Sequence, residues 1–257
     1  MERCVFKHIN NYLLSHNIIA HCQSDFTKGD SAINQLVEIT NNIGKVLDDG
    51  KEFRIVFCDV SKAFDKVWHR GLLHKLNNYG FGGNIIICLE HYLQDRFQRV
   101  AINGCHSSWQ YINAGVPQSS ILGPLLILLY INYIVDNIQS QVRLFADDTN
   151  IFLIVDNAIE SADILNRHLN TITSWSNKWL VNFNSPKTET MVILWKINKP
   201  HHPSLIMNNQ KLEDVKFHKH LGVTISDDGS WNKHIELVID KAYSRLNILR
   251  IVTCQGW

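Results

Sequence analysis

Two adjacent aspartates, Asp147 and Asp148, stand in the middle of a stretch, 143–152, that is rich in apolar and β-branched residues. Such residues on both sides of a short polar tip are typical of a strand–turn–strand hairpin. A carboxylate pair at a hairpin tip suits hard divalent cations, which prefer oxygen ligands. Aspartate also favours turns that bind nothing. This stretch alone therefore leaves a solvated Asp-Asp turn open.

A third carboxylate, Asp59, ends a nearly continuous apolar run of strand length that begins at Phe53. If this strand lies beside the hairpin, three carboxylates converge and repel one another unless cations neutralise them. Two Mg²⁺ ions about 3.5–4 Å apart would do so, and would serve an in-line phosphoryl transfer. Independent acidic caps and turns remain the alternative at this point.

The rest of the chain alternates helical and extended patterns. Apolar spacing predicts helices over residues 1–20, 33–43 (with Ser31 as a cap), 64–79 (with Ser61 as a cap), 84–93, 121–138, 158–179 and 235–249. Strands are expected over 98–102, 109–114, 189–195, 204–207, 211–212 and 220–225. Asn103-Gly104, a common hairpin pair, joins the first two of these strands. This order predicts an α+β fold with a helix-backed antiparallel sheet.

Composition limits the partners only weakly. The net charge of +1 gives no global basic signature, although a local basic groove stays possible. The six cysteines show no C-x-x-C spacing and follow no signal peptide, so we expect no disulfide partner and an intracellular site, cytoplasmic or nuclear. The longest apolar run, 121–135, is short and interrupted, so no membrane span is expected.

Five segments occur in an order that resembles the successive motifs of reverse transcriptases of non-LTR (LINE-type) retrotransposons. They are Phe57-Cys-Asp-Val-Ser-Lys-Ala-Phe-Asp65, Ala114-Gly-Val-Pro-Gln-Ser-Ser-Ile-Leu-Gly-Pro124, Phe145-Ala-Asp-Asp148, Asn184-Ser-Pro-Lys-Thr-Glu189 and His220-Leu-Gly-Val223. The resemblance covers almost the whole chain. It implies an RNA-directed DNA polymerase that takes an RNA template, a DNA primer and dNTPs, with two Mg²⁺ ions and Mn²⁺ as a possible substitute.

The resemblance also implies a right-hand polymerase architecture. Its fingers would cover 1–50 and 67–116, and its palm, with an antiparallel sheet, would cover 51–66 and 117–230. Residues 231–257 would be the start of a truncated thumb.

Matching the motifs residue by residue assigns the metal site and the nucleotide site. Asp59, Asp147 and Asp148 match the catalytic, metal-binding carboxylates, and the carbonyl of Val60 would complete the metal shell. The residues matched to the triphosphate and the pocket of the nucleotide are Lys28, Ser61, Lys62, Ala63, Phe64 and Gln118.

Several of these assignments have plainer alternatives. Phe64 would exclude a 2′-OH from the incoming sugar, or it could be an apolar position of its helix. Lys187 would act near the leaving pyrophosphate as a general acid, or it could be a solvated lysine. Gln118 could be a loop residue bonded to backbone. Residues His220, Leu221, Gly222 and Val223 would form the primer grip, or they could belong to a core strand.

Departures from the family pattern favour a decayed copy as the competing hypothesis. Thr27 replaces an arginine that contacts the triphosphate, and Asp25 replaces a glycine. The lost contact could cost a few kcal/mol. Ser119 replaces a glycine, at about 1–2 kcal/mol if φ must be positive there. Tyr133 replaces a frequent aspartate. A remnant that only binds nucleic acid therefore competes with an active enzyme, and Phe64 argues against a third reading, an RNA-templated RNA polymerase.

Overall fold

The computed structural model describes residues 2–25, 29–196 and 200–254, with side chains to residue 250. The helices are α1 (Glu2–Ser15), α2 (Ala32–Asp48), α3 (His69–Asn78), α4 (Asn84–Leu93), α5 (Leu122–Ile131), α6 (Ala158–Trp179) and α7 (Asn232–Cys254), with short 3-10 turns η1 (Ala63–Asp65), η2 (Asn132–Val135) and η3 (Ser185–Lys187). The strands are β1 (Glu52–Cys58), β2 (Phe97–Gln98), β3 (Ala101–Ile102), β4 (Cys105–His106), β5 (Gln110–Tyr111), β6 (Gln141–Phe145), β7 (Asp148–Val155), β8 (Glu189–Ile193), β9 (Ile206–Met207), β10 (Gln210–Lys211), β11 (Glu213–Asp214), β12 (Phe217–His220) and β13 (Val223–Ser226). The fold is mixed α+β, as expected.

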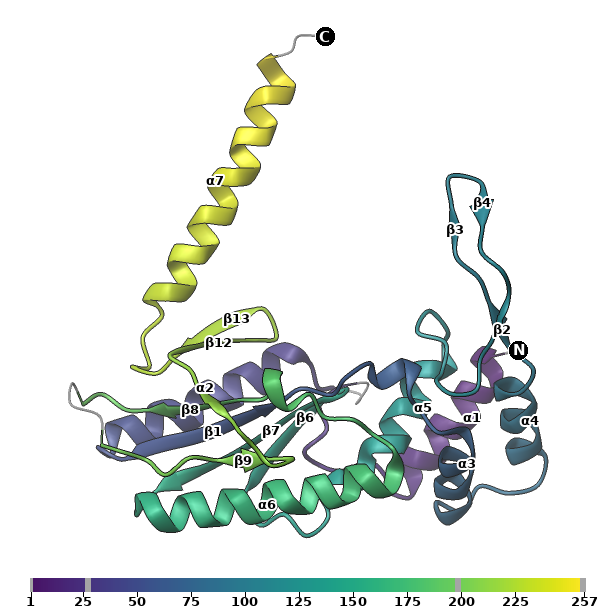
Figure 1. Ribbon diagram of the computed structural model, residues 1–257, viewed down its shortest axis with the longest axis horizontal. Helices are drawn as coiled ribbons and strands as arrows, with labels where there is room; N and C mark the ends of the chain where they lie inside the picture. The colour runs from purple at the N-terminus through teal and green to yellow at the C-terminus, as the bar shows by residue number, and fades with distance from the viewer. Residues whose placement is uncertain (1, 26–28, 197–199, 255–257) are drawn as a thin grey trace.

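A five-stranded sheet in the order β11-β8-β1-β7-β6 forms the centre of the molecule (Figure 1). β1 is antiparallel to both β7 and β8, and every residue of β1 is buried, which explains its nearly continuous apolar sequence. The register pairs Cys58 with Thr149. The residue after β1 therefore lies at the same edge of the sheet as the residue that begins β7.

Helices cover both faces of this sheet (Figure 1). On one face, Ile39 and Ile43 of α2 pack in one cluster with Phe53 and Ile55 of β1. On the other face, α6 buries a row of apolar residues that includes Leu165 in a cluster with residues of β1 and β7. Removal of these side chains from water is the main force that holds the layers together.

A group of helices, α1, α3, α4 and α5, lies at one end of the sheet (Figure 1). Nearly every residue of α5 is buried, as expected for a helix that is apolar all round. Lys75 of α3 is fully buried at the junction with α6, and its amine donates a hydrogen bond to the carbonyl of Tyr130. The amine lies 4.8, 4.6 and 4.0 Å from the ring centroids of Tyr130, Trp175 and Trp179. This aromatic cage links the helical group to the sheet.

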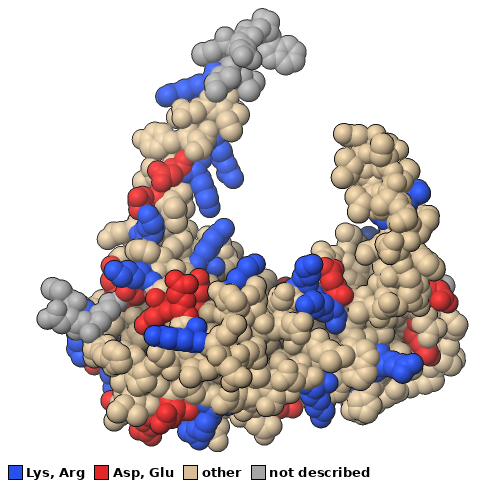
Figure 2. Space-filling view, in the orientation of Figure 1, with Lys and Arg blue, Asp and Glu red and all other residues tan. Residues whose placement is uncertain are grey.

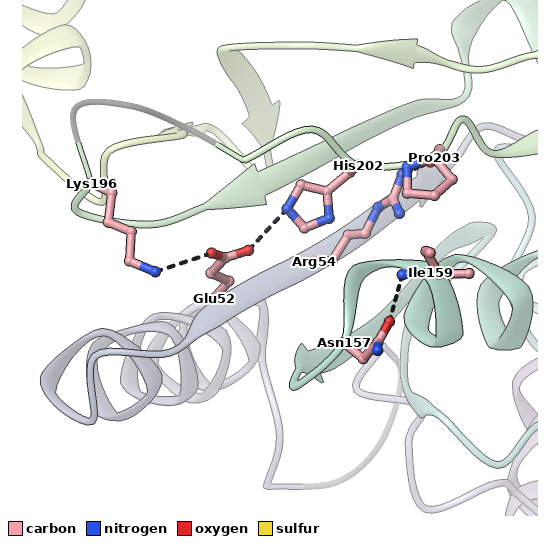
Figure 3. Close-up of polar contacts among 7 residues, drawn as sticks. All are labelled: Glu52, Arg54, Asn157, Ile159, Lys196, His202 and Pro203. Atoms are coloured by element: carbon pink, nitrogen blue, oxygen red, sulfur yellow. Dashed lines mark hydrogen bonds and ion pairs between the residues drawn. The ribbon is translucent and has the colours of Figure 1, made fainter.

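Polar contacts hold His202 and Pro203 against β1, at the end of this strand that is remote from Asp59 (Figure 3). His202 lies 2.9 Å from Glu52, and the guanidinium of Arg54 donates to the carbonyl of Pro203 at 2.8 Å. Nearby, Asn157 caps α6 by accepting a 2.9 Å hydrogen bond from the amide of Ile159. This cluster holds the fold together at a place remote from the Asp-Asp hairpin.

Two elements stand out from the body on the same side and leave a hollow between them (Figures 1 and 2). One is the hairpin built from β2 to β5, and the other is α7, which exposes apolar residues such as Ile235, Ile239 and Leu246. Among the helices in the described residues, none is long and apolar enough to cross a membrane.

Several local predictions are confirmed. Ser31 caps α2 by accepting a hydrogen bond from the amide of Asn34. Asn103 and Gly104, both with positive φ, form the tip of the β3–β4 hairpin. Besides these two predictions, the structure shows Gly80, with φ of 88°, just after the end of α3, where positive φ is easily reached only by glycine.

Two predictions about element boundaries are wrong. The helix expected from Phe64 begins only at His69, and Ser61 does not cap it. Residues 63–65 form a 3-10 turn instead, because the carbonyl of Phe64 accepts from the distant amide of Val116. The single strand expected over 220–225 is broken by the turn Leu221-Gly222, where both residues have positive φ, and two strands form a hairpin.

Candidate active site

The Asp-Asp hairpin has a two-residue turn. Phe145 of β6 pairs with Asp148 of β7, so Ala146 and Asp147 make the turn between them. Ala146 has a φ of 50°, a conformation that costs an alanine about 1–2 kcal/mol. Such strain persists where the surroundings enforce it, as they do at functional sites. The predicted strand–turn–strand is confirmed, with Asp147 at its tip.

A segment from the N-terminal part of the chain braces this turn. The amide of Ser24 donates to the carbonyl of Leu144 at 3.0 Å, and the amide of Leu144 donates to the carbonyl of Cys22 at 2.8 Å. The side-chain amide of Gln23 donates to the carbonyl of Ala146 at 3.3 Å. These bonds extend the edge of the sheet beside β6 and hold the strained residue in place.

Asp59 is fixed at the neighbouring strand end by its backbone. Its amide donates to the hydroxyl of Thr188 at 3.3 Å, and its carbonyl accepts from the amide of Asn184 at 2.8 Å. The loop that contains the predicted Lys187 is therefore attached to the backbone of Asp59. Lys187 itself ends η3 and is exposed.

The two carboxylates of the hairpin, Asp147 and Asp148, both have a raised pKa. Partial loss of water raises the pKa of Asp148 to about 6, and the charges of Asp147 and Asp59 add to that shift. Loss of water also raises the pKa of Asp147, again with a contribution from Asp59. Asp148 keeps solvent contact, so the repulsion is partly screened by water. The strand register thus places the three acids at one edge of the sheet, and their role as a joint metal site stays a prediction.

The chemistry of this acidic corner fits divalent cations. Carboxylates that repel one another gain by taking up protons or cations, and carboxylate oxygens are the ligands that Mg²⁺ prefers. The acids are neighbours without being a closed cage: within the described ranges, no three Asp, Glu, His or Cys side chains already form a metal-binding group. Rotation of the side chains on their fixed strand ends would be needed to close one.

The predicted nucleotide-pocket residues Lys62, Phe64 and Gln118 line one hollow. Phe64 is half-buried in η1 and packs against the hydrophobic core, so it is an apolar position of a 3-10 turn and not of the predicted α-helix. The side-chain amide of Gln118 donates to Asp65 at 3.2 Å rather than to backbone. The amide of Ser61 donates to the carbonyl of Asn182 at 2.8 Å and is thus already paired.

Gly115 supports this hollow and cannot carry a side chain. Its φ is 94°, and an added Cβ would lie 2.8 Å from the carbonyl oxygens of Phe64 and Asp65. We expect Gly115→Ala to lower the free energy of unfolding by about 2 kcal/mol, measured by urea denaturation. Gly104→Ala is the matched control, because Gly104 also has positive φ but no atom within 4 Å of the added carbon. Equal losses in the two variants would contradict the tight contact.

Two histidines attach the predicted primer-grip hairpin, β12–β13, to the sheet. His218 lies 2.6 Å from Glu189 and stacks on Phe57 at 3.6 Å between ring centroids. His220 is buried, and its ring nitrogen Nε2 accepts from the side chain of Asn150 at 3.0 Å. His220 lies in a motif that marks it in the sequence, whereas His218 and Asn150 lie in no such motif. Asn150 and His220 are seventy positions apart, and no local pattern predicts a contact over that distance.

Burial lowers the pKa of His220 to about 4, and the neighbouring His218 adds to the shift. The unfolded chain then binds more protons than the folded chain below pH 6.5, so stability falls as the pH drops from 6.5 towards 4. Between pH 7 and pH 5 we expect a loss of about 2 kcal/mol from this group. Urea titrations of the wild-type chain and His220→Gln at both pH values measure it. The same acid-induced loss in the variant would disprove the assignment.

Of four further positions from the sequence analysis, the structure describes two. Lys28 and Thr27 lie outside the described residues. Ser119 is not among the residues with positive φ, so the strain considered for a serine there is absent. Tyr133 stacks on Tyr79 at 5.0 Å between centroids, so the residue that replaces the frequent aspartate packs against the helical group.

Comparisons with known proteins agree with this geometry. The reverse transcriptase (RNA-dependent DNA polymerase) family matches residues 1–225. The probable RNA-directed DNA polymerase from transposon BS of Drosophila melanogaster is 27% identical over 257 residues, which cover 97% of this chain and 28% of that protein. The RNA-directed DNA polymerase from mobile element jockey of Drosophila funebris is 27% identical over 91% of this chain and 26% of its own length. The chain thus spans about a quarter of these relatives.

Solved structures share the fold. Apo telomerase from Candida tropicalis superposes with a TM-score of 0.56 at 13% identity, over 88% of this chain and 39% of that one. Telomerase from Candida albicans, in complex with a fragment of telomeric RNA, gives a TM-score of 0.52 at 14% identity, over 89% of this chain and 38% of that one. Because the family match covers most of the residues, the chain belongs to the reverse transcriptase (RNA-dependent DNA polymerase) family.

Proposed function

We propose that this chain is the catalytic part of an RNA-directed DNA polymerase of a non-LTR retrotransposon, which extends a DNA primer with dNTPs on an RNA template. The observation that carries the proposal is the meeting of Asp59, at the end of β1, with Asp147 and Asp148, at the tip of the β6–β7 hairpin. The family membership and the transposon relatives support it.

In this proposal the five-stranded sheet and α6 belong to the palm, over 51–66 and 117–230. The fingers comprise 1–50 and 67–116, which supply α1, α2, α3, α4 and the protruding hairpin. Residues from 231 onward, with α7, begin the thumb. The hollow between the hairpin and α7 is then the space for a template–primer duplex (Figure 2).

Asp59, Asp147, Asp148 and the carbonyl of Val60 are the groups that would hold two Mg²⁺ ions, with Mn²⁺ as a substitute. When bound, such ions neutralise developing charge and make the primer hydroxyl a better nucleophile. The carboxylates orient the primer 3′-OH towards the α-phosphate. Its oxygen forms a new bond to the α-phosphorus and passes its proton to solvent water. The bond from the α-phosphorus to the oxygen that bridges to the β-phosphate breaks, and pyrophosphate leaves with that oxygen.

The residues around the hollow position the nucleotide. The backbone amide of Ser61 already donates to the carbonyl of Asn182. The groups that contact the triphosphate are therefore the backbone amides of Lys62 and Ala63 and the side-chain amine of Lys62. Gln118 lines the same pocket near the template base. Lys187 donates a proton to the leaving pyrophosphate, from a loop that is tied to Asp59 through Thr188.

Primer extension tests the proposal directly. The purified chain should add dNTPs to a DNA primer annealed to RNA, and addition of EDTA should stop it. Tight binding of the hybrid without any metal-dependent incorporation would select the decayed, nucleic-acid-binding remnant instead. A preference for rNTPs would select the RNA polymerase reading.

The ring of Phe64 is expected to select the sugar. Phe64→Ala should raise the efficiency of rNTP relative to dNTP incorporation roughly 10- to 100-fold, because it removes the bulk that meets a 2′-OH. Phe64→Tyr keeps the ring and is the control, with selectivity near that of wild type. Single-nucleotide incorporation kinetics measure both variants, and unchanged selectivity in Phe64→Ala would rule this role out.

A further inference from the structure

The protruding hairpin carries aromatic and basic side chains in contacting pairs. Phe97 and Tyr111 are cross-strand neighbours whose rings meet edge to face, with 5.2 Å between centroids. Two residues further along, the guanidinium of Arg99 lies 4.6 Å from the centroid of Trp109. Because side chains alternate along a strand, Phe97 and Arg99 lie on one face of the hairpin. We call Phe97, Arg99, Trp109 and Tyr111 the stacking strip.

The stacking strip is open to solvent. Phe97 is 57% exposed, Trp109 is 59% exposed and Tyr111 is 50% exposed, although large aromatic rings gain most from burial. The hairpin stands clear of the body, so packing within the chain does not account for these rings (Figure 1). A contiguous exposed apolar surface of this kind marks an interaction site.

The charge within the hairpin favours a polyanion. From Arg96 to Val135 the sequence contains no aspartate or glutamate, while it contains Arg96 and Arg99. An aromatic ring paired with a guanidinium plane offers flat surfaces for bases and a cation for phosphate. Single-stranded nucleic acids bind to such platforms because their base faces are free, whereas the bases of a duplex already stack on one another.

The strip leads directly into the proposed nucleotide pocket. Arg96 and Phe97, at the base of the hairpin, line the same hollow as Lys62, Phe64 and Gln118. In the space-filling view the hairpin forms one wall of the open side of the molecule, across from α7 (Figure 2). A strand stacked along the hairpin would therefore continue into the pocket where the template base is copied.

We infer that the stacking strip holds the single-stranded RNA template ahead of the base being copied. This inference rests on the proposed polymerase function and assigns to one hairpin a partner that the carboxylate site does not specify. Stacking on Trp109 and the charge of Arg99 supply affinity without base selectivity, as a template of any sequence requires.

Equilibrium binding with a labelled template–primer tests the inference. Two hybrids share one duplex: in the first the RNA template ends at the base to be copied, and in the second it continues for several nucleotides. By fluorescence anisotropy the wild-type chain should bind the second hybrid about tenfold more tightly. The double variant Arg99→Gln/Trp109→Ala should lose most of this gain and keep its affinity for the first hybrid.

The control is Val100→Thr/Ile102→Thr, which changes two exposed residues on the opposite face of the hairpin and should preserve the gain. The inference is overturned if the Arg99/Trp109 variant still binds the second hybrid more tightly than the first. It is also overturned if the wild-type chain binds the two hybrids equally. Dimers of wild-type chain that the Arg99/Trp109 variant abolishes, in sedimentation without nucleic acid, would reassign the strip to protein contact. Failure of the proposed function is separate, since it appears as missing incorporation on the first hybrid.

Discussion

Asp147→Asn is expected to reduce the rate of nucleotide incorporation by about a thousandfold or more. Asparagine preserves the shape of the side chain but removes a negative charge from the tip of the β6–β7 hairpin. Loss of a single contact that stabilises charge in the transition state lowers the rate about 10²–10³-fold. Loss of a carboxylate that holds a metal ion should lower the rate further. Single-turnover extension of a DNA primer on RNA measures the effect.

The fold should tolerate this change. Loss of water and the charge of Asp59 raise the pKa of Asp147, so its ionised form is disfavoured in the folded chain, and the neutral amide should leave stability equal or slightly higher. Asp156→Asn is the matched control, because Asp156 is an exposed partner of Lys51 at 3.0 Å. Its incorporation rate should equal that of wild type. A comparable rate in Asp147→Asn would remove this carboxylate from the chemistry.

We expect the free energy of unfolding of the wild-type chain to rise with pH, and we expect Lys75→Met to abolish this rise. Burial lowers the pKa of the Lys75 amine to about 7, and the three aromatic rings and the charge of Asp136 offset only part of the lost hydration. In the unfolded chain the same amine titrates near 10.4. From pH 7 to pH 9.5 the unfolded state therefore binds more protons, and the folded state gains on the order of 3 kcal/mol.

Urea denaturation of the wild-type chain and of Lys75→Met at pH 7 and pH 9.5 checks this, since the difference between the two chains isolates the contribution of the Lys75 amine. Methionine fills the aromatic cage with an uncharged chain of similar length, so the variant should also be more stable than wild type at pH 7. A control variant at an exposed lysine of α7, Lys241→Met, should retain the pH dependence. A pH slope that Lys75→Met leaves unchanged would show that the amine stays charged within the cage.

The central features of the site followed from sequence because each depends on a local pattern. An apolar run that ends in Asp59 and a β-branched hairpin around Asp147 specify two strands. Once the strands pair, with Cys58 opposite Thr149, the convergence of the acids follows. The glycine after α3 and the tip of the β3–β4 hairpin were predictable for the same reason, since the requirement for positive φ is local.

What escaped prediction depends on contacts between distant segments. The helix expected at Phe64 gives way to a 3-10 turn because the amide of Val116 takes the carbonyl of Phe64. His218 attaches its hairpin to the sheet only because the fold brings Phe57 and Glu189 into contact with its ring. A lysine in the pattern of an amphipathic helix reads as surface, yet Lys75 is enclosed by rings that follow it by 55 to 104 positions. No periodicity in the chain encodes such meetings.

Anomalous diffraction from crystals grown with Mn²⁺ tests most directly whether the three acids form one cation site. We predict an anomalous Mn²⁺ signal in contact with the carboxylates of Asp59 and Asp147 in the wild-type chain. This signal should be lost in Asp59→Asn. Manganese bound elsewhere, or a wild-type structure in which Asp59 lies far from the hairpin tip, would contradict this prediction.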